Sequence, residues 1–86
     1  MKIVIPSPLR SYTHDVGEVE ANGASLAEVL QDLDAHYSGI RFRIMDEQDR
    51  IRPHIKIFAN QTLIKSIDTA LQSTDKVLIV CALSGG

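Results

Sequence analysis

Apolar and polar residues alternate in the first quarter of the chain in a way that predicts two β-strands. Residues 2–7 are rich in β-branched side chains and contain Pro6, which is typical of a short strand that ends early. Residues 16–21 alternate loosely between the turn-like residues 13–15 and 22–23, and we interpret them as a second strand. Together the two segments predict an N-terminal β-hairpin.

The clearest periodic signal is helical. Ser25 and Glu28 have the spacing of a capping box, in which each side chain satisfies a free backbone N–H at the helix start. Gly39 has the residue type that commonly follows the last turn of a helix. The segment between them therefore predicts one amphipathic helix, whose apolar stripe consists of Leu26, Val29, Leu30, Leu33 and Tyr37.

The second half of the chain predicts shorter elements and one strongly apolar strand. Residues 40–53 are dense in charge and indicate a short helical turn followed by an exposed loop. Residues 55–59 predict a strand, residues 63–64 a short strand, and residues 67–71 a turn of helix. Residues 77–83 are apolar on both faces, which is typical of a strand in the centre of a sheet.

This order of elements predicts an α+β fold, with a mixed sheet packed on one main helix. If the last strand lies centrally beside the first, the architecture is the β-grasp, or ubiquitin-like, fold. A chain of 86 residues with 44% hydrophobic content supports one core. We expect residues 1–83 to form that domain and residues 84–86 to form a flexible Ser-Gly-Gly tail.

The composition of the chain argues against several classes of protein. A net charge of −2 lacks the basic excess of a nucleic-acid-binding protein. No run approaches the roughly 18 apolar residues of a membrane span, and the apolar start is too short for a signal peptide. Cys81, the one cysteine, has no partner for an internal disulfide, so we expect a cytoplasmic protein.

Nothing in the chain predicts an autonomous active site. His14, His36 and His54 lack the spacing of metal ligands, and no phosphate-binding glycine motif is present. We therefore expect no bound metal or cofactor, and a protein that is not an enzyme. Cys81 is either a redox or persulfide-bearing thiol or, if it is buried in the last strand, an inert small hydrophobic residue.

The candidate chemistry lies at the C-terminus. Gly85 and Gly86 lack Cβ atoms, so together with Ser84 they form a slender stalk that can enter a narrow tunnel in a partner. The stalk ends in a free α-carboxylate, which is a poor electrophile until another protein activates it. A terminal Gly-Gly pair by chance is the alternative interpretation.

The last strand also suggests a docking surface. Leu78 and Val80 point away from Val77 and Ile79, and one helix covers only one face of the sheet. We expect Leu78 and Val80 to form an exposed apolar patch that binds a partner, and we assign Leu83 to the same patch. The alternative is that loops cover this face.

The charged segment after the helix has two interpretations. Its arginines either dock on an acidic edge of a partner or form a solvated mixed face with neighbouring acids. The arginines are Arg41, Arg43, Arg50 and Arg52, and the acids are Asp46, Glu47 and Asp49.

Four segments give the chain a resemblance to a known family: IPSPLRSYT (5–13), residues 25–46, IKIFAN (55–60) and DKVLIVCALSGG (75–86). These segments are similar to the MoaD/ThiS sulfur-carrier proteins, and most of all to the branch that serves cysteine biosynthesis. The resemblance implies that an E1-like adenylyltransferase uses ATP to adenylate Gly86. Sulfur then displaces AMP, which leaves a thiocarboxylate on Gly86. It also implies a pyridoxal-phosphate-dependent cysteine synthase as acceptor and a metalloprotease that releases the product.

Other functions share the same tail. The chain is alternatively the small subunit of a molybdopterin synthase or a thiamine-type sulfur carrier. A third possibility is a ubiquitin-like modifier that is joined to lysines through Gly86, and a fourth is an interaction domain with an inert tail.

Overall fold

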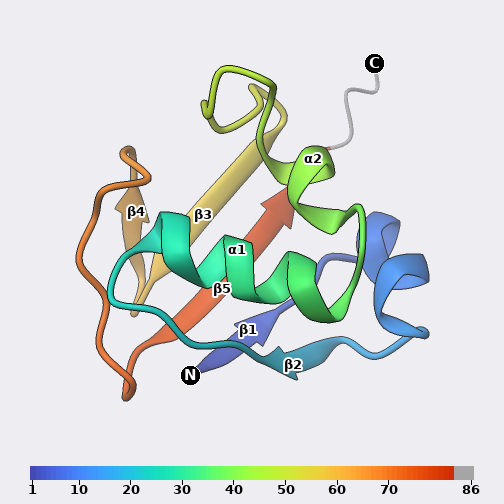
Figure 1. Ribbon diagram of the computed structural model, residues 1–86, viewed down its shortest axis with the longest axis horizontal. Helices are drawn as coiled ribbons and strands as arrows, with labels where there is room; N and C mark the ends of the chain where they lie inside the picture. Colours follow the sequence, from blue (N-terminus) through green and yellow to red (C-terminus); the bar gives the residue numbers. More distant parts are fainter. Residues whose placement is uncertain (83–86) are drawn as a thin grey trace.

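Five strands form one mixed sheet, and the main helix covers one side of it (Figure 1). The computed structural model describes residues 1–82. The strand order is β2-β1-β5-β3-β4, with β5 parallel to β1 and antiparallel to β3. This order confirms the predicted α+β, β-grasp fold and the central place of the last strand. The strands are β1 (Lys2–Val4), β2 (Glu18–Glu20), β3 (Ile55–Ala59), β4 (Thr62–Ile64) and β5 (Lys76–Cys81).

The main helix, α1 (Leu26–His36), begins at the predicted cap. The Ser25 Oγ accepts a hydrogen bond from the Glu28 N–H at 3.3 Å. The return bond differs from the prediction, because the Glu28 carboxylate accepts from the Ala24 N–H at 3.2 Å rather than from Ser25. Gly39, with φ of 96°, does not follow the last turn of α1 directly. It precedes a second short helix, α2 (Ile40–Ile44), which is the predicted helical turn.

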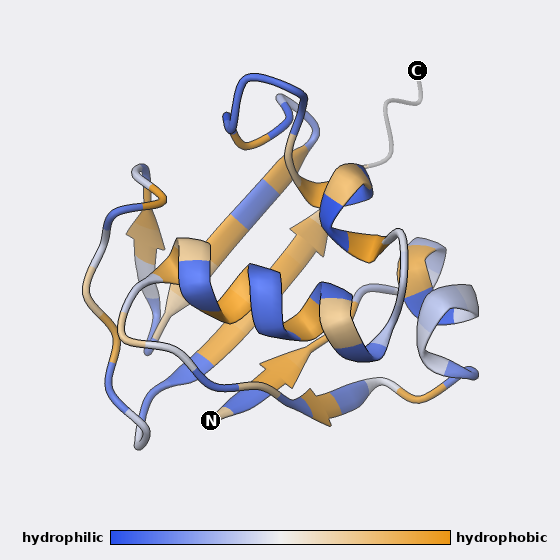
Figure 2. Cartoon of the chain, viewed as in Figure 1, coloured by the Kyte–Doolittle hydropathy of each residue, from blue (hydrophilic) through white to orange (hydrophobic). Residues whose placement is uncertain are grey.

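The core lies between α1 and the sheet. Figure 2 shows apolar residues on the strands beneath α1 and along the helix itself. Leu26, Val29, Leu30 and Leu33 are 0% exposed, so the predicted apolar stripe is confirmed for these four residues. They pack in one cluster with the inward side chains of the sheet, which include Ile3, Ile57, Val77 and Ile79.

The segment between the first two strands differs from a tight hairpin. β1 and β2 pair antiparallel, as predicted, but β1 ends at Val4 and a 3₁₀ helix, η1 (Ser7–Thr13), follows it. Pro8 lies in the first turn of that helix, where a residue without an N–H and with a fixed φ is tolerated. The prolines that end the strand therefore also start a helix.

The predicted turn of helix at residues 67–71 is wrong. This segment runs beside the start of α1, where the Ile67 carbonyl accepts from the Ala27 N–H at 2.8 Å and the Thr69 carbonyl accepts from the Leu26 N–H at 3.0 Å. The first N–H groups of a helix have no partner within the helix. The segment supplies these partners, and residues 67–68 form a single turn, closed by a hydrogen bond from the Thr69 N–H to the Ser66 carbonyl at 3.2 Å, rather than a turn of helix.

Candidate functional site

The central strand carries the chain to the end of the sheet that lies beside α2 (Figure 1). The Ala82 N–H donates a hydrogen bond to the His54 carbonyl at 2.7 Å, which fixes the backbone just after β5. Four residues that the sequence assigns to the site, Leu83, Ser84, Gly85 and Gly86, lie outside the described residues, and their roles stay predictions.

The two faces of β5 differ sharply in exposure. Val77 and Ile79 are 0% and 1% exposed, whereas Leu78 and Val80 are 40% and 36% exposed. Leu78 and Val80 are therefore an uncovered apolar surface, which loops do not shield.

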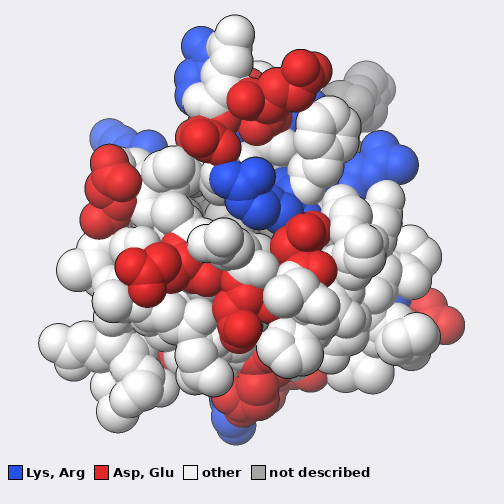
Figure 3. Space-filling view, viewed as in Figure 1, with Lys and Arg blue, Asp and Glu red and all other residues white. Residues whose placement is uncertain are grey.

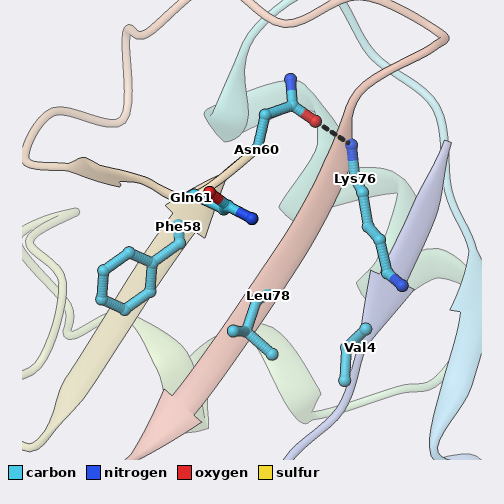
Figure 4. Close-up of a pocket in the computed structure, with 6 residues that line it drawn as sticks. All are labelled: Val4, Phe58, Asn60, Gln61, Lys76 and Leu78. Carbon is cyan, nitrogen blue, oxygen red and sulfur yellow. Dashed lines mark hydrogen bonds between the residues drawn. The ribbon is translucent and has the colours of Figure 1, made fainter.

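Leu78 belongs to a row of apolar side chains that crosses three strands. Leu78 pairs in register with Val4 of β1 and with Phe58 of β3, and Figure 4 shows these side chains on neighbouring strands of one face. We call Val4, Leu78 and Phe58 the apolar row. The row lines a shallow hollow of about 790 Å³, together with Asn60, Gln61 and Lys76.

Charged side chains border the apolar row. The Glu18 carboxylate lies 3.7 Å from the Lys2 Nζ and 3.9 Å from the Lys76 Nζ. Lys56 is exposed and pairs in register with Val80. The surface therefore has an apolar centre and a polar rim, which is the usual anatomy of a protein–protein interface.

The turn between β3 and β4 fixes one end of the hollow. Asn60 and Gln61 have φ of 50° and 77°. The Asn60 side chain accepts a hydrogen bond from the Lys76 N–H at 3.0 Å (Figure 4) and donates one to the Asp75 carboxylate at 2.7 Å. Hydrogen bonds from the Gln72 N–H and then from Asn60 hold the pKa of Asp75 below its usual value. These bonds tie the turn to the start of β5.

A second hollow lies where the chain leaves β5, and we call it the tail-exit hollow. Its volume is about 290 Å³, and its lining residues are Pro8, Leu9, Ser11, Tyr12, Arg43, His54 and Cys81. A further hollow of about 550 Å³ shares Val4 and Leu78 with the first and Pro8 and Cys81 with the tail-exit hollow. Cys81 is half-buried and packs against the core, so its exposure lies between those of the two interpretations.

The four arginines of the charged segment have different partners. Arg41 lies 2.8 Å from the Asp49 carboxylate, and Arg50 lies 3.6 Å from that of Asp46. These two pairs are the mixed face that the alternation of charges indicated, and Figure 3 shows basic groups near α2 between acidic ones. A hydrogen bond from the Arg50 N–H is the main reason why the pKa of Asp46 is lowered.

The other two arginines contact aromatic rings. The Arg43 Nε donates a hydrogen bond to the Tyr12 hydroxyl at 2.6 Å, and this bond raises the pKa of Arg43. The Arg52 guanidinium lies 4.7 Å from the centre of the Phe42 ring. Sequence reasoning missed both contacts, and Tyr12 and Arg43 are 31 residues apart in the chain.

Two negative findings concern the described residues. Within residues 1–82, no three His, Cys, Asp or Glu side chains gather as a metal site would require. No helix in that range combines the length and the apolarity needed to cross a membrane.

The sheet order and the single covering helix define the class of protein: a β-grasp, ubiquitin-like domain whose central last strand leads to the C-terminus. The particular family follows from comparison with known proteins. The chain matches the ThiS family over residues 3–86, and it belongs to that family of sulfur carriers. It is therefore a carrier protein rather than an enzyme.

Similar proteins support this placement. The chain is 35% identical to the sulfur carrier protein CysO of Mycobacterium tuberculosis over 89 aligned positions. This alignment covers 98% of the chain and 96% of that protein. The crystal structure of Mycobacterium tuberculosis CysO superposes with a TM-score of 0.90 at 32% identity, over 95% of this chain and 98% of that chain.

Two further similar proteins bear on function. A chain of the BexX/CysO complex of Amycolatopsis orientalis gives a TM-score of 0.91 at 26% identity, with 99% and 98% coverage. The small archaeal modifier protein 3 of Haloferax volcanii is 29% identical over 66 residues, which cover 73% of this chain and 71% of that protein.

Proposed function

We propose that this chain carries sulfur as a thiocarboxylate on Gly86. An E1-like adenylyltransferase transfers AMP from ATP to the Gly86 carboxylate and releases pyrophosphate. A sulfur nucleophile then displaces AMP from the acyl-adenylate, and the C–S bond of the thiocarboxylate replaces one C–O bond. The observation that carries this proposal is the match to the ThiS family, which extends through residue 86 and includes the terminal Gly-Gly.

The fold supports the proposal through the position of β5. This strand is held between β1 and β3 in the centre of the sheet, and Ala82 is fixed by its hydrogen bond to His54. Gly86 is four residues beyond Ala82, so it reaches at most about 14 Å from that point. Ser84 and Gly85 give this reach, and an enzyme that holds Gly86 therefore lies close to the end of β5.

The exposed patch is the proposed docking surface for that enzyme. Leu78 and Val80 lie on β5 itself, and we assign Leu83, two residues beyond β5 in the sequence, to the same patch. An exposed apolar surface with a polar rim is the kind of surface that binds a protein partner. The crystal structure of the BexX/CysO complex shows that a similar chain forms a complex with another protein.

We further propose that the sulfur serves cysteine biosynthesis in the cytoplasm. The acceptor is a pyridoxal-phosphate-dependent cysteine synthase, and a metalloprotease releases the product amino acid. The similarity to CysO of Mycobacterium tuberculosis supports this branch of the family over the molybdopterin-synthase and thiamine-type branches. ATP and pyridoxal phosphate belong to the partner enzymes, not to this chain.

The direct test is the intact mass of the chain after incubation with ATP, a sulfide source and the E1-like enzyme of the same organism. We expect a mass gain that matches replacement of one oxygen by sulfur, localised to Gly86 by fragmentation. A reaction without ATP is the control. An unchanged mass, with an enzyme shown to be active on another substrate, would contradict the proposal.

A second candidate function is conjugation to proteins through Gly86, which the similarity to the archaeal modifier favours. The sequence provides a specific signature for this function. Lys76 is the last Lys or Arg in the chain, so trypsin would leave residues 77–86 attached to a modified lysine. Peptides from cell extract that carry this remnant would establish conjugation. Their absence, in cells that load sulfur on Gly86, would leave the carrier function alone.

A further inference from the structure

The tail-exit hollow brings together several hydrogen-bond donors, and no carboxylate of the described part of the chain lines it. The Arg43 Nε is used by Tyr12, and the two NH₂ groups of this exposed guanidinium make no hydrogen bond with residues 1–82. The Tyr12 hydroxyl accepts that bond, so its own proton remains available to an acceptor. Ser11 and His54 add polar groups to the lining. Within residues 1–82, no Asp or Glu lines this hollow.

The nearby carboxylates of Asp46 and Asp49 do not neutralise the positive charge of Arg43, because each pairs with another arginine. Asp49 lies against Arg41, and Asp46 lies against Arg50. No carboxylate of residues 1–82 comes within 4.0 Å of the Arg43 guanidinium, whereas Arg41 and Arg50 each have one. Arg43 is exposed, and Tyr12 holds it in place through both the hydrogen bond and the ring, whose centre is 5.9 Å from the Arg43 Cζ. The result is a positioned cation on an open surface.

The hollow also lies where a partner must be. Cys81, one residue before Ala82, is part of its lining. An enzyme that holds Gly86 comes within about 14 Å of Ala82, which brings it close enough to contact this part of the surface. An uncompensated guanidinium that becomes covered loses water, and this cost is offset when an opposite charge receives its hydrogen bonds.

We propose that the tail-exit hollow receives a carboxylate side chain of the enzyme that binds Gly86. The carboxylate accepts from the outer NH₂ groups of Arg43 and from the Tyr12 hydroxyl. Arg43 thus forms an ion pair with the partner beside the tail, while the patch of Leu78 and Val80 supplies apolar contact. The identity of the partner rests on the proposed function, but the chemistry of the hollow does not.

The first test compares two variants that change the charge equally. Arg43→Gln and Arg50→Gln each shift the net charge from −2 to −3. We expect Arg43→Gln to weaken binding of the purified E1-like enzyme about tenfold at low ionic strength, and Arg50→Gln to weaken it less than about twofold. The effect of Arg43→Gln should shrink as salt is raised. Equal weakening by both variants, or none by Arg43→Gln, would overturn the proposal.

A positioning variant adds a second readout. Tyr12→Phe keeps the ring but removes the hydroxyl that holds Arg43, so we expect a smaller loss of affinity with the same salt dependence. Combining Tyr12→Phe with Arg43→Gln should add little, because both act through one guanidinium. Fully additive losses would show that Tyr12 acts elsewhere and would remove it from the site.

The second test needs neither the enzyme nor the tail chemistry. The full ¹⁵N-labelled chain is titrated with a blocked tri-aspartate peptide, and we expect shifts at the Arg43 Nε–H and at the Cys81 and Ala82 amides. Inorganic phosphate at the same ionic strength should cause smaller shifts. No shift with the peptide would show that the hollow binds no carboxylate. Larger shifts with phosphate would assign it to a free anion, and shifts on simple dilution would assign it to a second copy of the chain. Each of these outcomes overturns the proposal. Sulfur loading that fails while the peptide binds would instead remove the proposed function and leave the hollow.

Discussion

The exposed patch gives a prediction whose size follows from the structure. Complete burial of a Leu or Val side chain contributes about 1.5–3 kcal/mol. Leu78 and Val80 are 40% and 36% exposed, so covering what remains contributes together about 1–2 kcal/mol. The double variant Leu78→Thr, Val80→Thr removes most of this apolar contact. We therefore expect the dissociation constant with the E1-like enzyme to rise roughly 5- to 30-fold.

The same variant should fold normally. Threonine is β-branched and suits a strand, and neither side chain belongs to the buried face of β5. Val16→Thr is the matched control, because Val16 is 47% exposed and precedes β2 rather than lying on β5. Binding is measured by titration calorimetry, and stability by urea unfolding. Unchanged affinity in a folded double variant would refute the docking role of the patch, and equal losses in the control would show a non-specific effect.

Three further outcomes are expected. Gly86→Ala places a methyl group at the reacting end, so it should slow sulfur loading, read by intact mass, without changing the unfolding midpoint. Leu30→Ala leaves a cavity at a residue that is 0% exposed, and it should lower the free energy of unfolding by about 2–5 kcal/mol in urea. The pKa of Asp75 is lowered on folding from its usual 3.8, so its contribution to stability is present above that pH and is lost as the pH falls through the lower folded-state value. Asp75→Asn should flatten that part of the pH–stability curve, and a curve identical to the wild type would contradict this assignment.

The features that sequence predicted well are those that one segment encodes by itself. The stripe of α1 is specified by helical spacing, and Leu26, Val29, Leu30 and Leu33 are buried as expected. The alternation in β5 separates Val77 and Ile79 from Leu78 and Val80 in the way that strand geometry requires. A strand that is apolar on both faces belongs in the centre of a sheet, and β5 lies there. From these local patterns the β-grasp fold follows.

The features that sequence did not predict depend on partners far away in the chain. Residues 67–71 have the composition of a helical turn, but their carbonyls are used by the first N–H groups of α1. Val4 is part of the apolar row only because β1 pairs with the last strand. Tyr12 and Arg43 meet because η1 packs beside α2. No periodicity within one segment indicates such pairs.

The division of roles along β5 also separates binding from chemistry. The inner face of the strand anchors the sheet on α1, and the outer face is exposed. Under the proposed function, the chain beyond β5 carries the reacting carboxylate of Gly86. Loss of Leu78, Val80 or Arg43 should therefore slow loading only when the enzyme is below saturation, because we assign these residues to binding of the enzyme and not to the bond that is made at Gly86. A change at Gly86 should instead lower the rate at saturating enzyme. A patch variant that lowered the saturated rate would show that the surface also sets the position of the tail in the active site.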